Sequence, residues 1–142
     1  IPRRHLAPVL ERIAELSREF NLPVANVFHA GDGNLHPLIA FDANDDDSLR
    51  RAALLGGRIL AACVEVGGTV TGEHGVGVEK LNEMCLQFTD AELDTFLALK
   101  AAFDPKGLLN PGKAVPTLHR CAEFGAMHVK GGKLPHPELE RF

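Results

Sequence analysis

The chain has 142 residues, a length typical of one domain, and its 45% hydrophobic and 24% charged residues indicate an ordinary globular protein. Fifteen Lys and Arg against 19 Asp and Glu give a net charge of -4, which excludes a generally basic surface and makes nucleic acid or an anionic membrane an unexpected partner. No apolar run approaches the roughly 20 residues that span a bilayer, and no basic-then-apolar signal stretch opens the chain, so a cytoplasmic protein is expected.

The first part of the chain predicts a helix followed by a hairpin. Residues Leu6–Phe20 carry apolar side chains at spacings of three and four, which is one stripe of an amphipathic helix. Val24–Phe28 is a short apolar run suited to a strand, and Leu38–Phe41 is a second one. The loop between them, residues 29–36, contains the turn-forming sequence Gly-Asp-Gly-Asn. The two runs are therefore expected to form a hairpin.

A second helix and another strand are expected next. Acidic residues at 45–47 precede a helical pattern from about Leu49 to Val66, and the pair Gly67–Gly68 is typical of a helix end. A short strand at 69–71 then leads into a glycine-rich loop, residues 72–77. Its glycines let the backbone turn tightly or approach a ligand closely.

The rest of the chain predicts two more helices and an arm. The first helix covers about Glu79–Cys85. The second starts at a capping box, in which Thr89 is followed by Glu92, and runs to Phe103. From Ala114 onward the sequence has little periodicity and several Pro and Gly residues, so an extended C-terminal arm is expected over residues 114–142.

The order helix, strand, strand, helix, strand predicts an α+β fold. It is that of a ferredoxin-like split βαββαβ unit with its first strand truncated, followed by the additional C-terminal helices and the extended arm. Ile1 falls at or just after the end of the absent strand, and the chain does not begin with Met. The sequence therefore indicates a piece of a longer protein. A sheet edge left open by truncation would favour a homodimer.

The loop between the first two predicted strands carries the strongest chemical signal, His29-Ala-Gly-Asp-Gly-Asn-Leu-His36. Two imidazoles on either side of a tight turn can be brought together at one end of a hairpin, where they can hold a divalent metal through ring nitrogens. The alternative is that Asp32, Gly33 and Asn34 are simply good turn residues that the histidines flank. The spacing alone leaves both interpretations open.

Glu73 and His74 give the second signal. They lie in the glycine-rich loop after the third predicted strand, a position suited to facing a ligand, and a solvated polar loop is the alternative. If the sheet brings the two loops together, His29, His36 and Glu73 supply two nitrogens and one carboxylate. Three protein ligands leave a coordination position for water or substrate, which is the pattern of catalytic metal sites.

Three segments, in this order and spacing, resemble a known family: HAGDGNLHP at 29–37, GGTVTGEHGVG at 67–77 and LLNPGK at 108–113. They are similar to the C-terminal domain of FAD-linked oxidases, the family of D-lactate dehydrogenases, D-2-hydroxyglutarate dehydrogenases and glycolate oxidase subunits. The resemblance covers essentially the whole chain. The residues from His36 to Asp42 and the tail after Val115 are most like the glycolate oxidase branch.

The resemblance implies a role for each of these motifs. His74 would be the catalytic base that takes the substrate hydroxyl proton while hydride leaves for the flavin. Asn110 and Lys113 would belong to the segment that returns toward FAD, a cofactor bound mainly by an N-terminal domain absent from this chain. A divalent metal, Zn or Mn, would be held by His29, His36 and Glu73.

The implied function is that of the substrate- and metal-binding portion of a flavin-dependent 2-hydroxy acid oxidase or dehydrogenase, with glycolate favoured and D-lactate second. Some relatives have an asparagine where Leu38 stands here, which argues against hydroxyglutarate as substrate. Residues 1–113 would form the domain proper and residues 114–142 its arm. The isolated chain is expected neither to bind FAD tightly nor to turn over substrate.

The resemblance also implies partners: a small 2-hydroxy acid, and other subunits of an oxidase complex that would place a cytoplasmic enzyme at the periphery of the inner membrane. Two rival hypotheses come from other classes. One is a non-catalytic interaction module, whose arm docks on partner subunits while the histidines only shape a turn. The other is a stand-alone metal hydrolase built on His29, His36 and Glu73, which leaves the flavin-family tail unexplained.

Overall fold

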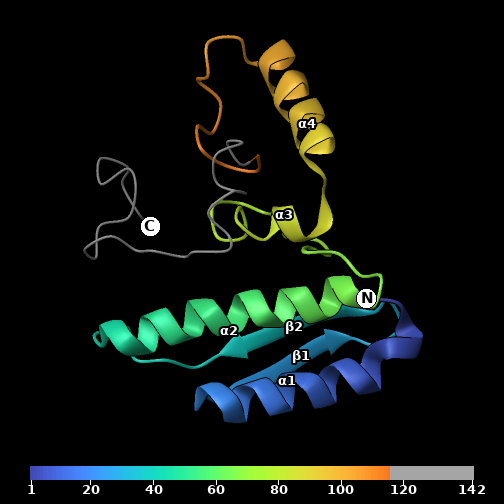
Figure 1. Ribbon diagram of the computed structural model, residues 1–142, viewed down its shortest axis with the longest axis vertical. Coiled ribbons are helices and arrows are strands. Elements are labelled where there is room, and N and C mark those ends of the chain that lie inside the picture. The colour runs from blue at the N-terminus through green and yellow to red at the C-terminus, as the bar shows by residue number, and fades with distance from the viewer. Residues whose placement is uncertain (116–142) are drawn as a thin grey trace.

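The computed structural model describes residues 1–115, which combine helices with one two-stranded antiparallel sheet (Figure 1). The α+β class predicted from the sequence is confirmed. The expected arm falls, from residue 116 to residue 142, outside the described residues. In chain order the elements are η1 (Arg3–His5), α1 (Leu6–Phe20), β1 (Val24–His29), β2 (Asn34–Ile39), α2 (Asp46–Glu65), α3 (Met84–Gln87) and α4 (Asp90–Phe103).

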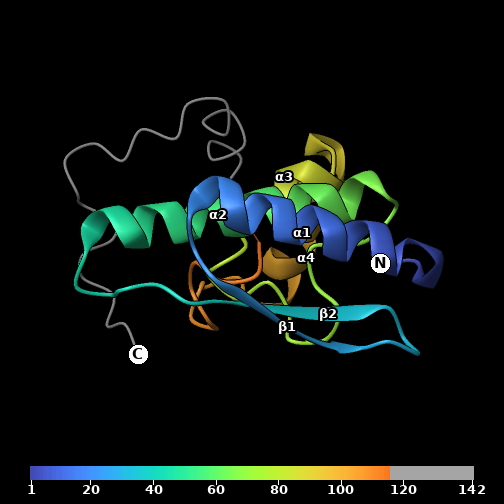
Figure 2. The same cartoon turned by 90° about the horizontal axis from the view of Figure 1, so that it is seen from below.

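Helices α1 and α2 lie side by side over one face of the hairpin, and Figure 2 shows the helix layer and the strand layer edge-on. The apolar stripe predicted for α1 is buried between the helix layer and the strand layer. From the strands, Val24, Leu35 and Ile39 pack against this core. The buried core residues are Val9, Ile13, Leu16, Leu22, Ala52, Leu55, Ile59 and Cys63.

The register of the hairpin decides which strand residues face away from the helices. Val24 pairs with Ile39, and Val27 pairs with His36. Because side chains alternate between the two faces of a sheet, and because Val24 and Ile39 face the core, Val27 and His36 lie on the outer face. In the described part of the chain this outer face is open, since Val27 is 54% and Leu38 is 56% exposed.

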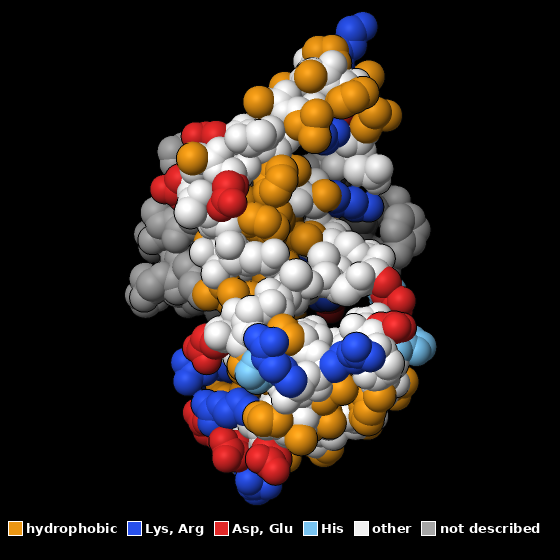
Figure 3. Space-filling view, turned by 90° about the vertical axis from the view of Figure 1, so that its right-hand side faces the viewer, with side chains coloured by type: hydrophobic (Ala, Val, Ile, Leu, Met, Phe, Trp, Pro, Cys, Tyr) orange, Lys and Arg blue, Asp and Glu red, His pale blue; other side chains and the backbone are white. Residues whose placement is uncertain are grey.

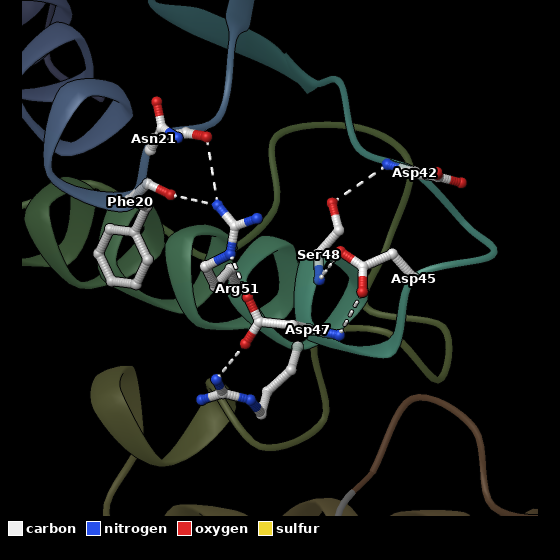
Figure 4. A network of polar contacts seen from close by, with 8 residues as sticks. Phe20, Asn21, Asp42, Asp45, Asp47, Ser48 and Arg51 are labelled. Carbon is white, nitrogen blue, oxygen red and sulfur yellow. Dashed lines mark hydrogen bonds and ion pairs between the residues drawn. The ribbon is translucent and has the colours of Figure 1, made fainter.

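A polar network joins the end of α1 to the start of α2 (Figure 4). Nη1 of Arg51 donates to the carbonyl oxygens of Phe20 at 2.8 Å and Asn21 at 3.2 Å, and its Nε donates to Asp47 Oδ2 at 2.8 Å. The carboxylate of Asp45 caps α2 by accepting from the backbone N–H of Asp47. The network ties the end of α1 to the first turn of α2, and the Asp45 cap starts α2 at Asp46, earlier than predicted.

The second predicted strand is displaced in the structure. β2 runs from Asn34 to Ile39, whereas the apolar pattern predicted Leu38–Phe41. The turn at 30–33 closes directly behind His29, whose carbonyl accepts from the N–H groups of Asp32 and Gly33, both at 3.0 Å. Cross-strand pairing then begins at once, so polar residues that no apolar pattern marks become the start of the strand.

The strand expected at 69–71 is not formed in the described structure, so this part of the split βαββαβ prediction is wrong. A strand needs a neighbour that satisfies its backbone groups. The segment is held by a side chain instead: the N–H of Val70 donates to Gln87 Oε1 at 2.9 Å, and Val70 is buried. The helices and the central hairpin of the predicted unit are present.

The helix expected at 79–85 is also different. Residues 77–83 form turns, and only Met84–Gln87 is helical. Leu81, Glu83 and Met84 are all buried, which consecutive turns permit and one stripe of a helix does not. Glu83 lies against α2, where a Cβ on Gly57 would come within 3.3 Å of its Oε1.

The last predicted helix is confirmed. α4 ends at Phe103, and its capping box is complete, with the Thr89 N–H donating to Glu92 Oε2 at 2.8 Å. Figure 1 shows that α4 stands away from the hairpin. None of the helices within residues 1–115 is long and apolar enough to cross a membrane.

Candidate metal centre

The loop after α2 brings Glu73 to the hairpin. α2 ends where Gly67 adopts a φ of 80° and the N–H of Gly68 donates to the carbonyl of Cys63 at 2.9 Å. The chain reaches the hairpin at Gly72, whose backbone lies directly against the side chain of Asn34. Glu73 and the following histidine are thereby presented beside the outer face of β2.

Three side chains predicted to be metal ligands come together there. His29, His36 and Glu73 each offer one ligand atom, and these atoms lie within 4.8 Å of one another. His36 Nε2 is 3.1 Å from Glu73 Oε1, and the ring centroids of the two histidines are 5.5 Å apart. Among residues 1–115, these three side chains are the His, Cys, Asp or Glu residues that lie close enough together to hold one metal ion.

The geometry fits a divalent cation. Ligand atoms at about 2.0–2.2 Å from a tetrahedral Zn²⁺ stand roughly 3.3 Å from one another. The separation of His36 and Glu73 is close to this value. The whole group is somewhat wider, so a small side-chain rotation would complete the ligand set. Two imidazole nitrogens and one carboxylate oxygen suit Zn²⁺ well.

His74 stands at the open side of this cluster. Its Nε2 is 3.1 Å from Glu73 Oε1, and its ring centroid is 5.2 Å from that of His36. Its side chain is 75% exposed, whereas that of His36 is 22% exposed. The histidine predicted to be the base is therefore accessible to a ligand bound at the cluster.

Asn110 and Lys113 lie on a turn of their own. The carbonyl of Asn110, a residue with a φ of 45°, accepts from the Lys113 N–H at 3.2 Å. The N–H of Ala114 donates to the carbonyl of Gly77 at 2.8 Å, which ties this turn to the end of the glycine-rich loop. The structure thus attaches the segment to the loop that carries Glu73, and it places neither residue among the three ligand atoms.

Sequence reasoning treated Asn34 only as a turn residue. In the structure Asn34 is the first residue of β2, and its Nδ2 lies 3.3 Å from His36 Nε2. The available signal was the spacing of two residues between Asn34 and His36, which puts both side chains on one face of a strand. That signal was hidden because the strand was predicted to begin only at Leu38.

An apolar cleft of about 490 Å³ lies elsewhere, between residues 69–76, α3 and α4. Figure 3 shows hydrophobic side chains gathered over this half of the molecule. None of the cluster residues lines the cleft. Its polar lining residues include Gln87, which already accepts from the Val70 N–H, and Lys100, which already pairs with Asp104, so the cluster is the better candidate for chemistry. The apolar lining residues are Val70, Val76, Met84, Phe88, Phe96, Leu99, Phe103, Ala114 and Val115.

Residues 1–114 match the family of FAD linked oxidases, C-terminal domain, and the chain belongs to this family. It is 68% identical over 142 residues to glycolate oxidase subunit GlcD of Escherichia coli (strain K12), which covers 100% of this chain and 28% of that protein. It is 38% identical over 113 residues to glycolate oxidase subunit GlcD of Bacillus subtilis (strain 168). This match covers 80% of the present chain and 24% of that relative. It is 34% identical over 121 residues to the mitochondrial D-lactate dehydrogenase (cytochrome) of Arabidopsis thaliana. This match covers 85% of the present chain and 21% of that relative.

The resemblance seen in the sequence motifs is thereby confirmed. The chain spans between 21% and 28% of the length of these relatives.

Proposed function

We propose that this chain forms the substrate- and metal-binding part of a flavin-dependent 2-hydroxy acid oxidase, with glycolate as the preferred substrate and D-lactate second. The observation that carries the proposal is the convergence of His29, His36 and Glu73 on the open face of the hairpin, with His74 exposed beside them. The similarity to glycolate oxidase subunits and to D-lactate dehydrogenases supports this class of substrate.

The three ligands orient the substrate. When bound, a divalent cation supplies Lewis-acid polarisation of the substrate hydroxyl, and FAD accepts the hydride. The residues that would hold the cation are His29, His36 and Glu73, and three protein ligands would leave coordination positions for oxygen atoms of the substrate.

His74 moves the proton. When its Nε2–H donates to Glu73 Oε1, the lone pair is on Nδ1, which is the atom that receives the hydroxyl proton. Once His74 has taken the hydroxyl proton, bound FAD would accept the C2 hydrogen as hydride, which would leave a carbonyl group on the substrate. Glu73 therefore serves both as a ligand and as the partner that sets the tautomer of His74.

The outer face of the hairpin supports a small substrate. Val27 pairs directly with His36, and Leu38 lies on the same face of β2 as His36. Both side chains are apolar, and both are more than half exposed. Such a surface suits a hydrogen or a methyl group on C2, as in glycolate or D-lactate. Neither side chain offers a hydrogen bond or a positive charge to a second carboxylate.

We place FAD mainly outside these 142 residues. The sequence has no Gly-x-Gly-x-x-Gly motif after a strand, and the turn with Asn110 and Lys113 would only approach the cofactor. The chain by itself then neither binds FAD tightly nor oxidises substrate. The subunit names of the relatives support assembly with further oxidase subunits. The proposal also places the enzyme in the cytoplasm, in contact with the membrane through those partners.

The test of this function is His74→Ala in the complete protein. The variant should retain its flavin, while glycolate-dependent flavin reduction in a stopped-flow experiment should fall about 10²–10⁴-fold, the usual contribution of a general base. His5→Ala, a histidine of η1, is the matched control and should reduce flavin at the normal rate. Normal reduction in His74→Ala would remove this residue from the mechanism. A non-catalytic interaction module predicts that neither variant affects flavin reduction.

A further inference from the structure

The side chain of Asn34 fills the space between the two loops that supply the cluster. A Cβ built on Gly72 would lie 2.3 Å from Asn34 Oδ1 and 2.9 Å from Asn34 Cγ, far inside van der Waals contact. The amide therefore rests on the bare backbone of Gly72, and a larger residue at position 72 requires the Asn34 side chain to move away. On its other side, Asn34 Nδ2 lies 3.3 Å from His36 Nε2.

The chemistry of these atoms sets the protonation of the His36 ring. An amide N–H only donates, so the 3.3 Å contact with Asn34 Nδ2 forms a hydrogen bond when His36 Nε2 carries the lone pair and the ring proton is on Nδ1. The same Nε2 lies 3.1 Å from Glu73 Oε1, and an ionised carboxylate also only accepts. The Nε2–H tautomer would donate to Glu73, so the two contacts of Nε2 favour opposite tautomers, and only the Nδ1–H form leaves the Nε2 lone pair available to a cation.

We propose that Asn34 is a positioning residue for this cluster: seated on Gly72, it holds the His36 ring in the Nδ1–H tautomer with the Nε2 lone pair toward Glu73, and it keeps the glycine-rich loop in register with the hairpin. The inference rests on the proposed function only in taking the cluster as a metal site. Asn34 itself is not a ligand. Asn34 orients the ligand His36, as groups outside the coordination sphere commonly do at metal sites.

The positions offer a matched set of variants. Asn34→Ala removes the donor. Gly72→Ala leaves Asn34 in the sequence but forces its side chain to rotate away, because the new Cβ takes its place. Gly31→Ala is the control, since a Cβ there meets nothing within 4 Å in the same hairpin turn. Asn82→Ala, at an exposed position, controls for loss of an amide.

The first readout is the tautomer of His36 in the metal-free 142-residue chain, measured from the ¹⁵N shifts of its ring by NMR. The native chain and both controls should show the Nδ1–H form. Asn34→Ala and Gly72→Ala should both shift the ring toward the Nε2–H form. Retention of the Nδ1–H form in either variant would overturn the proposal. Circular dichroism confirms that the compared chains share one fold.

The second readout is Zn²⁺ affinity by competition with a chromophoric chelator. Each of the two variants should bind about tenfold more weakly than the native chain, in the range seen for residues that orient metal ligands. The double variant should bind no more weakly than either single one, since both changes remove the same contact. Unchanged affinity in a variant that has lost the tautomer contradicts the positioning role.

The two readouts separate this inference from the proposed function. If the native chain binds no Zn²⁺ or Mn²⁺, the metal assignment fails, while the tautomer measurement still decides the role of Asn34. If the native chain binds Zn²⁺ and the variants match it in both readouts, the metal site stands and Asn34 is only a turn residue.

Discussion

His36 Nε2 and Glu73 Oε1 lie 3.1 Å apart, although His36 belongs to the middle of β2 and Glu73 to the loop beyond α2. No backbone ladder joins these two segments in the described structure. Their contact depends on α2, which packs on the inner face of the hairpin and delivers the chain to its outer face through the turn at Gly67. The candidate metal centre is thus a product of helix packing.

Removing a ligand should abolish specific metal binding. His36→Ala and Glu73→Ala should each weaken Zn²⁺ binding by more than the roughly 10–100-fold that loss of an orienting partner costs, because a coordinate bond is lost. Isothermal titration calorimetry measures the effect. His5→Ala should bind as the native chain does. Native affinity in both ligand variants would refute the metal assignment.

Truncating a buried side chain in the middle of α2 should lower the stability of the fold. Leu55 is 0% exposed, so Leu55→Ala should lower the free energy of unfolding by about 2–5 kcal/mol, the cost of lost burial plus a cavity. Leu49→Ala on the same helix removes a 47% exposed side chain and should change stability by less than about 0.5 kcal/mol. Urea titrations followed by circular dichroism compare the two. Equal losses would show that the core is elsewhere.

Arg51 and Arg50 should contribute differently to the stability of the fold, although both form an ion pair with Asp47. Arg51→Ala leaves two carbonyl groups at the end of α1 without their donor and should destabilise the fold by about 1–2 kcal/mol. Arg50 makes an exposed ion pair, and Arg50→Ala should cost far less. Thermal unfolding of both variants at moderate salt tests this order, and a larger loss in Arg50→Ala would reverse the interpretation.

Glu83 should make stability depend on pH. Burial raises the pKa of its carboxyl, with a smaller contribution from the neighbouring Glu79, and its Oε2 has no hydrogen-bond partner in the described structure. Because the pKa is higher in the folded chain than in the unfolded chain, ionised Glu83 destabilises the fold at neutral pH. This penalty disappears as the pH falls below the unfolded value.

Glu83→Gln should therefore stabilise the chain by about 1 kcal/mol at pH 7 and lose that advantage below about pH 4, where glutamate is neutral in both states. Urea titrations of the variant and the native chain at both pH values give the difference. Glu65→Gln, at an exposed position, should show no comparable change between them. A variant that is less stable than the native chain at pH 7 would mean that the carboxylate has a stabilising partner.

Helix positions followed from local sequence because their determinants are local. The stripe in α1 and the Thr89–Glu92 capping box are set by residues within one or two turns of each other, and the structure confirms both helices. The family was likewise readable from short ordered motifs. The identities of His29, His36, Glu73 and His74 as candidates came from those motifs and not from their distances.

Strand positions and side-chain neighbours depended on partners that are distant in the chain. The start of β2 at Asn34 is fixed by pairing with His29, and Val70 is held by Gln87 instead of by a neighbouring strand. The pattern of apolar residues along the chain encodes neither of these two contacts. It therefore misplaced β2, predicted a strand at 69–71 and missed the contact of Asn34 with Gly72 and His36.

The sequence by itself determined the helices that its periodicity and caps encode, the class of the fold, the family and the residues able to act as ligands or base. Only the tertiary structure decided that the ligand atoms of His29, His36 and Glu73 meet on the outer face of the hairpin. The reason is physical: hydrogen bonds and apolar stripes within a helix act over a few residues. The meeting of two loops is set by the burial of α2 against the strands, a property of the folded chain as a whole.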